Sequence, residues 1–123
     1  MRWPTFARAV SVYDEVNMSW SSAVAHSLGG AFLANSLPHL MAGVSGQALQ
    51  TPFASPPFKG LSRPIVNVAW ALVCLACAYL LLLRVGSFDI GSWPDFVVCF
   101  AGFAGMALQC SRSFTHLRKT APE

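Results

Sequence analysis

Three amide side chains and one histidine lie in apolar stretches of the sequence that contain no Asp, Glu, Lys or Arg. They are Asn35, His39, Asn67 and Gln109. Amide and imidazole groups are costly in an apolar medium unless they find hydrogen-bonding partners. If the segments that carry them cross a bilayer in alternate directions, all four reach one depth. They are then either helix-end caps and interhelical hydrogen bonds, or a layer that binds a ligand or an ion.

The stretch between the first two of these segments, from Ser45 to Arg63, is rich in proline and glycine. Proline fixes φ and removes a backbone donor, so we expect a structured loop here rather than a helix or a sheet. We predict that Gln50–Arg63 covers the polar layer, and that Thr51 and Ser62 contribute hydroxyl groups to it. The alternative is a loop that only connects two helices.

Another polar group in an apolar stretch is His26, whose predicted depth matches that of Tyr79 and Cys99. A histidine in a membrane span acts as a proton relay, as a metal or haem ligand, or as a donor to a neighbouring carbonyl or hydroxyl. One helix with histidines at the separation of His26 and His39 holds two haems in some membrane cytochromes, but each iron would need a second histidine from a symmetry mate. We expect the simple donor role and no cofactor.

The cysteines and the rest of the sequence give no catalytic or metal centre. Cys74 and Cys77 form C-x-x-C inside an apolar run, where thiols act as small hydrophobic groups, and no further ligands are spaced for zinc. Cys110, beside a serine and an arginine, is a candidate for palmitoylation. There is no serine–histidine–acid motif, phosphate loop or pair of intramembrane carboxylates, so an enzyme is the minority reading. It would need His39 or His26 as its base.

The composition is that of a membrane protein, with 54% hydrophobic residues, 11% charged residues and a mean hydropathy of +0.51. Soluble domains carry roughly 25% charged residues. The uncharged run Ile65–Leu83, flanked by Arg63 and Arg84, is long enough as a helix to cross the roughly 30 Å hydrocarbon core of a bilayer. The formal charge of +3 lies at segment ends, which suits anionic lipid headgroups and disfavours a nucleic-acid partner.

We predict an all-α fold, an integral membrane bundle of three transmembrane helices with the Pro/Gly-rich loop between the first and second. The first segment is rich in small and polar residues and needs protein neighbours in lipid, and the third is short. The alternative is a hairpin of the last two spans, with the first segment re-entrant or interfacial. The predicted membrane domain covers residues 19–112, with spans at about 20–40, 65–83 and 96–111. Residues 1–18 suit an interfacial helix rather than a cleaved signal peptide. Residues 113–123 form a basic C-terminal tail.

Charge placement predicts the orientation through the positive-inside rule. One side of the predicted membrane receives only cations: Lys59, Arg63, Arg112, Arg118 and Lys119. The other side mixes three arginines with four acids. We therefore expect a multi-pass protein of the cell (inner) membrane, with the long loop and the C-terminus in the cytoplasm and the N-terminus outside.

Small residues recur at four-residue steps on the first and third predicted helices; they include Gly30, Ala34, Ala101 and Gly105. Such stripes allow helix backbones to approach closely. They pack either within one chain or against another copy or another membrane protein, so we expect membrane lipids and a homo-oligomer or a membrane partner as the surroundings.

Residues between about 26 and 83 resemble the signature of a family of small bacterial integral membrane proteins that has no assigned activity. The resemblance implies a bacterial inner-membrane setting and a meaningful inner-side loop. Where this chain has Phe58 and Lys59, a nearby glycine would fit the signature better. The signature residues are Asn35, Pro38, His39, Gly43, Gly46, Thr51, Pro52, Phe53, Pro57, Gly60, Leu61, Ser62, Pro64, Asn67 and Trp70.

These patterns predict a binding or transport-related module whose working part is the polar layer under the loop. The alternative is a structural or partner-binding membrane subunit that works through its glycine and alanine stripes.

Overall fold

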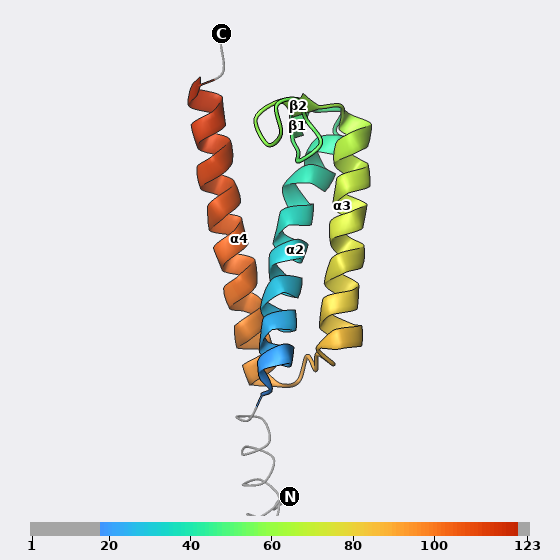
Figure 1. Ribbon diagram of the computed structural model, residues 1–123, viewed down its shortest axis with the longest axis vertical. Coiled ribbons are helices and arrows are strands. Elements are labelled where there is room, and N and C mark those ends of the chain that lie inside the picture. The colour runs from blue at the N-terminus through green and yellow to red at the C-terminus, as the bar shows by residue number, and fades with distance from the viewer. Residues whose placement is uncertain (1–17, 121–123) are drawn as a thin grey trace, which may run out of the picture.

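The computed structural model describes residues 18–120, which form three long helices that run side by side in alternating directions (Figure 1). The chain is mostly helical, as predicted. A two-stranded antiparallel hairpin lies in the loop between the first and second helices. The elements are α2 (Trp20–Val44), β1 (Leu49–Gln50), β2 (Leu61–Ser62), α3 (Pro64–Tyr79), the π-helical turn η1 (Leu80–Val85) that continues α3, and α4 (Trp93–Thr120).

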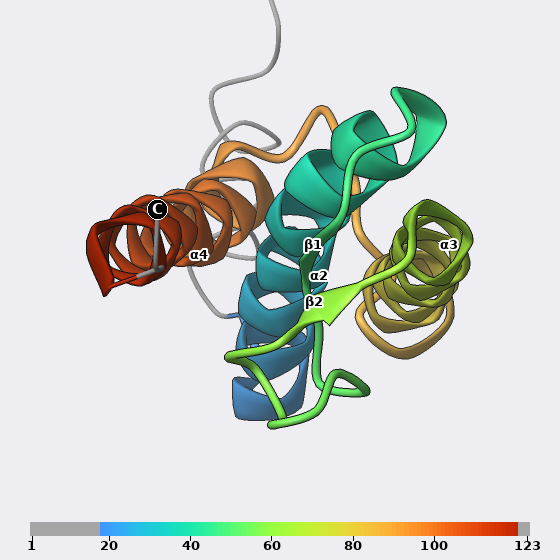
Figure 2. The same cartoon turned by 90° about the horizontal axis from the view of Figure 1, so that it is seen from above.

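α2 lies between the other two helices and packs on both, as the view along the bundle shows (Figure 2). Its buried positions are small or polar: Ala25, His26, Gly29, Gly30, Ala34, Ser36, His39 and Ala42. A helix with a neighbour on two sides needs small side chains so that both neighbours can approach. This position accounts for the weakly apolar composition of α2.

Two helices of the described chain are long and apolar enough to cross a membrane. They are Pro64–Val85, with a mean hydropathy of 2.4, and Trp93–Lys119, with a mean hydropathy of 1.3. Little of either is covered by the rest of the chain, and large apolar residues such as Leu72, Phe100 and Leu108 are more than half exposed. α2 is not one of the two, because serine, glycine, histidine and asparagine lower its hydropathy.

The helix ends differ from the predicted ones. α2 continues past Pro38 to Val44 and ends in a Schellman motif, in which Gly46 has a φ of 71° and the Gln47 amide donates to the Ala42 carbonyl at 2.8 Å. α4 continues to Thr120, so most of the predicted basic tail is helical rather than a separate segment. The predicted interfacial helix at 1–18 lies outside the described residues except for Met18.

Glycines set the crossing of α2 and α4. A Cβ atom on Gly30 would collide with the Cys99 backbone, and one on Gly102 would collide with the Ser27 backbone. Ala34, on the same helix as Gly30, is also buried. The other predicted stripe is placed differently: Ala101 and Gly105 are exposed, and nothing lies near a Cβ built on Gly105. Gly102, which follows Ala101 directly, packs against α2 instead.

The loop between α2 and α3 is a compact cover at one end of the bundle (Figure 1). Leu49 pairs with Ser62, and Gln50 pairs with Leu61. Phe58 has a φ of 62°, in the left-handed region that favours glycine. The sequence pattern had suggested a glycine near this position, and the backbone conformation explains why one would fit.

Candidate functional site

Asn67 ties the two ends of the loop to α3. Its side chain is fully buried, and its amide nitrogen lies 3.3 Å from the Leu49 carbonyl oxygen, 3.1 Å from that of Ser62 and 3.3 Å from that of Arg63. Two N–H groups therefore serve three acceptors. Because carbonyl oxygens only accept, the amide nitrogen must face them and the amide oxygen must face away.

That oxygen lies 2.8 Å from Nδ1 of His39, which is itself buried on α2. Since Oδ1 of Asn67 can only accept, Nδ1 of His39 must donate. In the neutral ring this leaves Nε2 with a free lone pair. Within residues 18–120, no hydrogen bond is made to Nε2, and His39 forms part of a cavity wall. Asn67 thus fixes the ring so that it presents an acceptor to the cavity.

Thr51 and Ser62 make hydrogen bonds within the loop and stabilise its shape. Their hydroxyl groups are hydrogen-bonded to each other, both residues are buried, and the Phe53 amide donates to the Thr51 hydroxyl at 3.3 Å. Neither residue lines the cavity. These predicted ligand-binding residues therefore shape the cover, as Asn67 does, and do not face what lies beneath it.

The cavity lies between α2 and α4 under the loop and has a volume of about 660 Å³, within the usual range for small-molecule sites. On α2 it runs from Leu28 to His39, which is about 16 Å of helix at 1.5 Å per residue. Its lining residues are Leu28, Ala31, Phe32, Asn35 and His39 from α2; Gln50, Pro52, Phe58 and Lys59 from the loop; Trp70 from α3; and Met106, Gln109, Cys110, Ser113, Phe114, His116 and Leu117 from α4.

The lining changes in character along the cavity. Toward the middle of the bundle the lining is apolar, with Leu28, Phe32 and Met106, whereas His39 and Lys59 lie at the loop end. The charged residues described at the loop end are all cations: Lys59, Arg63, Arg112, Arg118 and Lys119. The arrangement suits a molecule with an apolar body and a polar, negatively charged head.

Asn35 and Gln109 also line the cavity, so three of the four predicted polar-layer residues line it, and the fourth, Asn67, is hydrogen-bonded to His39 behind the lining. The Asn35 amide nitrogen donates to Sγ of Cys74 at 3.3 Å, and its oxygen lies 3.6 Å from Sγ of Cys110. This side chain therefore bridges all three helices. Gln109 is exposed on its outer side and donates to the Ser113 hydroxyl at 3.2 Å.

Several lining residues escaped the sequence prediction, including Trp70, Met106, Phe114 and Leu117. On α4 the members recur at steps of three and four residues, which is the spacing of one helix face. That spacing was visible in the sequence. It carried no sign of a cavity, because an apolar helix face next to another helix, to lipid or to a ligand has the same composition.

A second polar cluster lies at the opposite end of the bundle. His26 is 1% exposed, and its Nε2 lies 2.8 Å from the Gly86 carbonyl oxygen. Its Nδ1 lies 3.6 Å from Oδ1 of Asp95. The Phe88 ring meets the imidazole edge-on, with 5.3 Å between the ring centroids. The expected donor role of His26 toward a carbonyl is thus present, whereas Tyr79 is exposed and takes no part.

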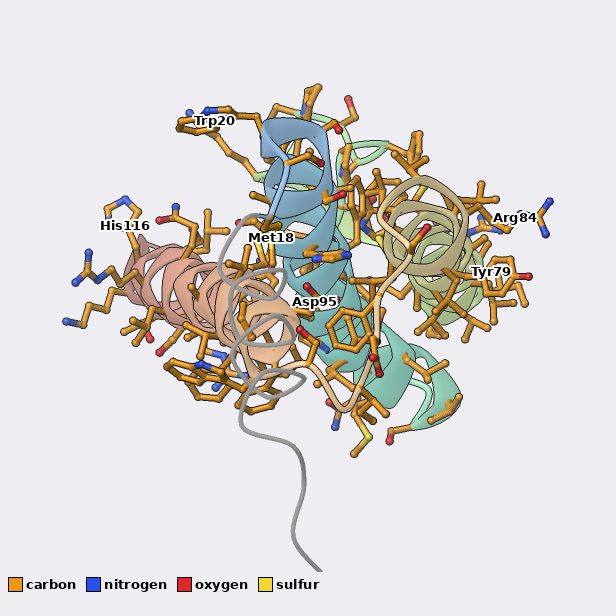
Figure 3. All side chains as sticks on the ribbon, turned by 90° about the horizontal axis from the view of Figure 1, so that it is seen from below. Met18, Trp20, Tyr79, Arg84, Asp95 and His116 are labelled. Atoms are coloured by element: carbon orange, nitrogen blue, oxygen red, sulfur yellow. The ribbon has the colours of Figure 1, made fainter. Side chains whose placement is uncertain are left out.

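Asp95 is the member of this cluster that sequence analysis missed. It lies in the first turn of α4, and its carboxylate accepts the Asp89 amide at 3.0 Å. Seen from this end, Asp95 lies near the centre of the bundle, while Arg84 and Tyr79 project outward (Figure 3). An aspartate at the start of a helix usually caps or complements the helix dipole, so its position gave no sign of a buried partner.

No protein-family model, no curated protein and no solved structure matches this chain. The resemblance to small bacterial membrane proteins therefore stays a prediction, and function is argued from the site.

Proposed function

We propose that this protein is a three-helix integral membrane protein that binds an amphipathic small molecule in the cavity between α2 and α4. The observation that carries the proposal is the cavity itself. Its roof is a loop that the buried Asn67 fastens down, and its wall includes His39, whose Nε2 accepts no hydrogen bond from the described residues. A merely architectural polar layer would have its hydrogen-bonding groups turned toward one another. Here Nε2 of His39 accepts no hydrogen bond from residues 18–120, and the imidazole lines the cavity with its edge contact to the Phe114 ring of α4, 6.0 Å between centroids.

The membrane setting is supported by the outer surfaces of the helices. α3 with η1, and α4, present apolar side chains where the chain leaves them uncovered. We propose that α2 crosses the bilayer as well, since its small and polar residues lie between these two helices and avoid lipid. The cationic loop end then lies in the cytoplasm and the start of α2 outside, in a bacterial inner membrane.

The ligand class follows from the lining. The apolar part of the molecule lies along Leu28, Phe32 and Met106, and its head lies under the loop. There it donates a hydrogen bond to Nε2 of His39 and places a negative charge near Lys59. The lipid headgroups around the basic end carry such charges. Whether the bound molecule is then moved or only held is a separate property of the site.

A photo-crosslinkable lysophosphatidylglycerol in lipid discs tests this proposal, because its glycerol hydroxyl groups can donate a hydrogen bond to Nε2 of His39 and its phosphate carries a negative charge. In the parent chain we expect labelling of Met106 and Phe114, which line the cavity, to exceed labelling of Phe100, which faces outward. Ala31→Trp fills the cavity and should reduce the labelling of the two lining residues several-fold, whereas Leu37→Trp on the exposed side of the same helix should not. Equal labelling in the two variants would contradict the proposal.

The alternative, a structural subunit that works through helix packing, has one observation in its favour. Ala101 and Gly105 form an exposed strip of small residues on α4 that nothing in the described chain covers. Gly105→Leu distinguishes the two functions. It should change the oligomeric state in lipid discs if the strip meets a partner, and it should leave labelling by the lysophospholipid unchanged if the cavity is the working part.

A further inference from the structure

The cluster of His26 and Asp95 has a hydrogen-bonding mismatch that one proton resolves. Nε2 of His26 lies 2.8 Å from the Gly86 carbonyl oxygen. A carbonyl oxygen cannot donate, so Nε2 must carry the hydrogen. In a neutral imidazole the other nitrogen, Nδ1, then has a lone pair and no hydrogen.

That lone pair faces a carboxylate. Nδ1 is buried, makes no hydrogen bond within the described residues, and lies 3.6 Å from Oδ1 of Asp95. A neutral imidazole and an ionised carboxylate would thus point two acceptors at each other, and water does not reach the imidazole nitrogen. A proton on either group converts this repulsion into an ion pair or a hydrogen bond.

Among residues 18–120, the neighbouring charged groups are engaged elsewhere or point away. Asp89 uses its carboxylate to accept the Gly91 amide at 2.8 Å, within its own turn. Arg84 on η1 and Tyr79 on α3 project away from the cluster (Figure 3). The Phe88 ring covers one edge of the imidazole.

We propose that His26 and Asp95 form a proton-binding site in the half of the molecule opposite the cavity, with one proton shared between imidazole Nδ1 and the carboxylate. The proton enters and leaves through Asp95, whose side chain is 15% exposed, while His26 is 1% exposed. The site links α2, the turn after η1 and the start of α4, so the proton holds these three segments together. This proposal is independent of the ligand in the cavity.

Asp95→Asn provides the decisive variant. The amide of asparagine can donate an N–H to Nδ1 of a neutral His26, so the variant needs no shared proton. Asp89→Asn, six residues earlier, removes the neighbouring acid and serves as the matched control.

The measurement is unfolding of the full chain in lipid discs across the range in which free carboxyl and imidazole groups titrate, from about pH 4 to about pH 9. A proton shared as proposed is bound by the folded chain but not by the unfolded chain above the range in which free imidazole titrates, so the stability that it contributes should be lost as pH rises through that range. We expect the folding equilibrium constant to fall by up to about tenfold per pH unit, as for one proton. Asp89→Asn should behave like the parent, and Asp95→Asn should lack this pH dependence.

A second measurement on the parent chain needs no variant. Nitrogen NMR of the histidine ring that contacts Phe88, combined with the infrared signal of protonated carboxyl groups, locates the proton. Either a doubly protonated ring or a protonated carboxyl at neutral pH supports the site. A neutral ring beside an ionised Asp95, or the same pH dependence in the parent and Asp95→Asn, would overturn it.

Discussion

At the scale of single residues, Asn67 and Gln109, two of the three amides of the polar layer, have different roles. Asn67 is fully buried and bonded through both ends of its side chain, whereas Gln109 is exposed and bonded once, to the neighbouring turn of its own helix. Their chemistry is the same, so the difference lies in what surrounds them. Asn67 is a positioning residue: it closes the loop and orients His39.

Asn67→Ala should therefore destabilise the protein. The substitution removes the acceptor of His39 Nδ1 and one donor from each of three loop carbonyl oxygens. The Arg63 carbonyl oxygen keeps the backbone amides of Val66 and residue 67. Each buried group that is left without any partner costs about 1–3 kcal/mol. Hydrogen exchange of the loop amides should accelerate by at least tenfold. Gln109→Ala, the matched amide control, should leave both loop exchange and unfolding unchanged. Slow exchange in Asn67→Ala would show that the loop is held by other contacts.

At the scale of helices, two glycines one turn apart on α4 are in different environments. Gly102 lies against the Ser27 backbone at the crossing of α2 and α4, and Gly105 lies against nothing in the described chain. Backbone cannot move aside as a flexible side chain can, so the crossing tolerates no larger residue at 102.

Gly102→Leu should separate α2 from α4 and lower the free energy of unfolding by about 1–3 kcal/mol or more, the usual range for an overpacked core. Gly105→Leu adds the same side chain on the open face and should leave the stability of the single chain as it was. The measurement is the midpoint of unfolding of both variants under the same conditions in lipid discs. If Gly102→Leu is as stable as Gly105→Leu, the close approach of the two helices is not required.

At the scale of the whole molecule, the described chain begins at one end of the bundle and finishes at the other (Figure 1). Three passes in alternating directions have this consequence, and a membrane around them would separate the two ends. α2 is the helix in question, because its hydropathy alone would not carry it across a bilayer.

Single thiols introduced at exposed positions test the three crossings. Ser19→Cys and Gly91→Cys should react with a membrane-impermeant maleimide from one side, and Ser55→Cys from the other. The parent chain is the control, because its four cysteines lie within the helices, buried or half-buried. Labelling of Ser19→Cys and Ser55→Cys from the same side would mean that α2 does not cross, and the hairpin alternative would hold.

The sequence by itself determined the helical class, the apolar character of α3 and α4, and the similar positions along the bundle of Asn35, His39 and Gln109, which line the cavity. Helical periodicity and the order of the segments are enough for these, because depth along a helix is proportional to residue number. The positive φ of Phe58 lies where the family resemblance, which stays a prediction, led us to expect a glycine.

Only the tertiary structure decided which helix lies in the middle, and with it the role of each polar group. The most apolar segment of the sequence became an outer helix, and the weakly apolar α2 became the centre, because small residues allow two neighbours and large apolar ones suit the outside. Three observations depend on how each helix is rotated about its own axis. Gly102 faces α2 while Gly105 faces outward, Asn67 does not line the cavity, and His26 lies beside Asp95. Rotation is set by packing against neighbours that are distant in the chain, and local sequence does not encode it.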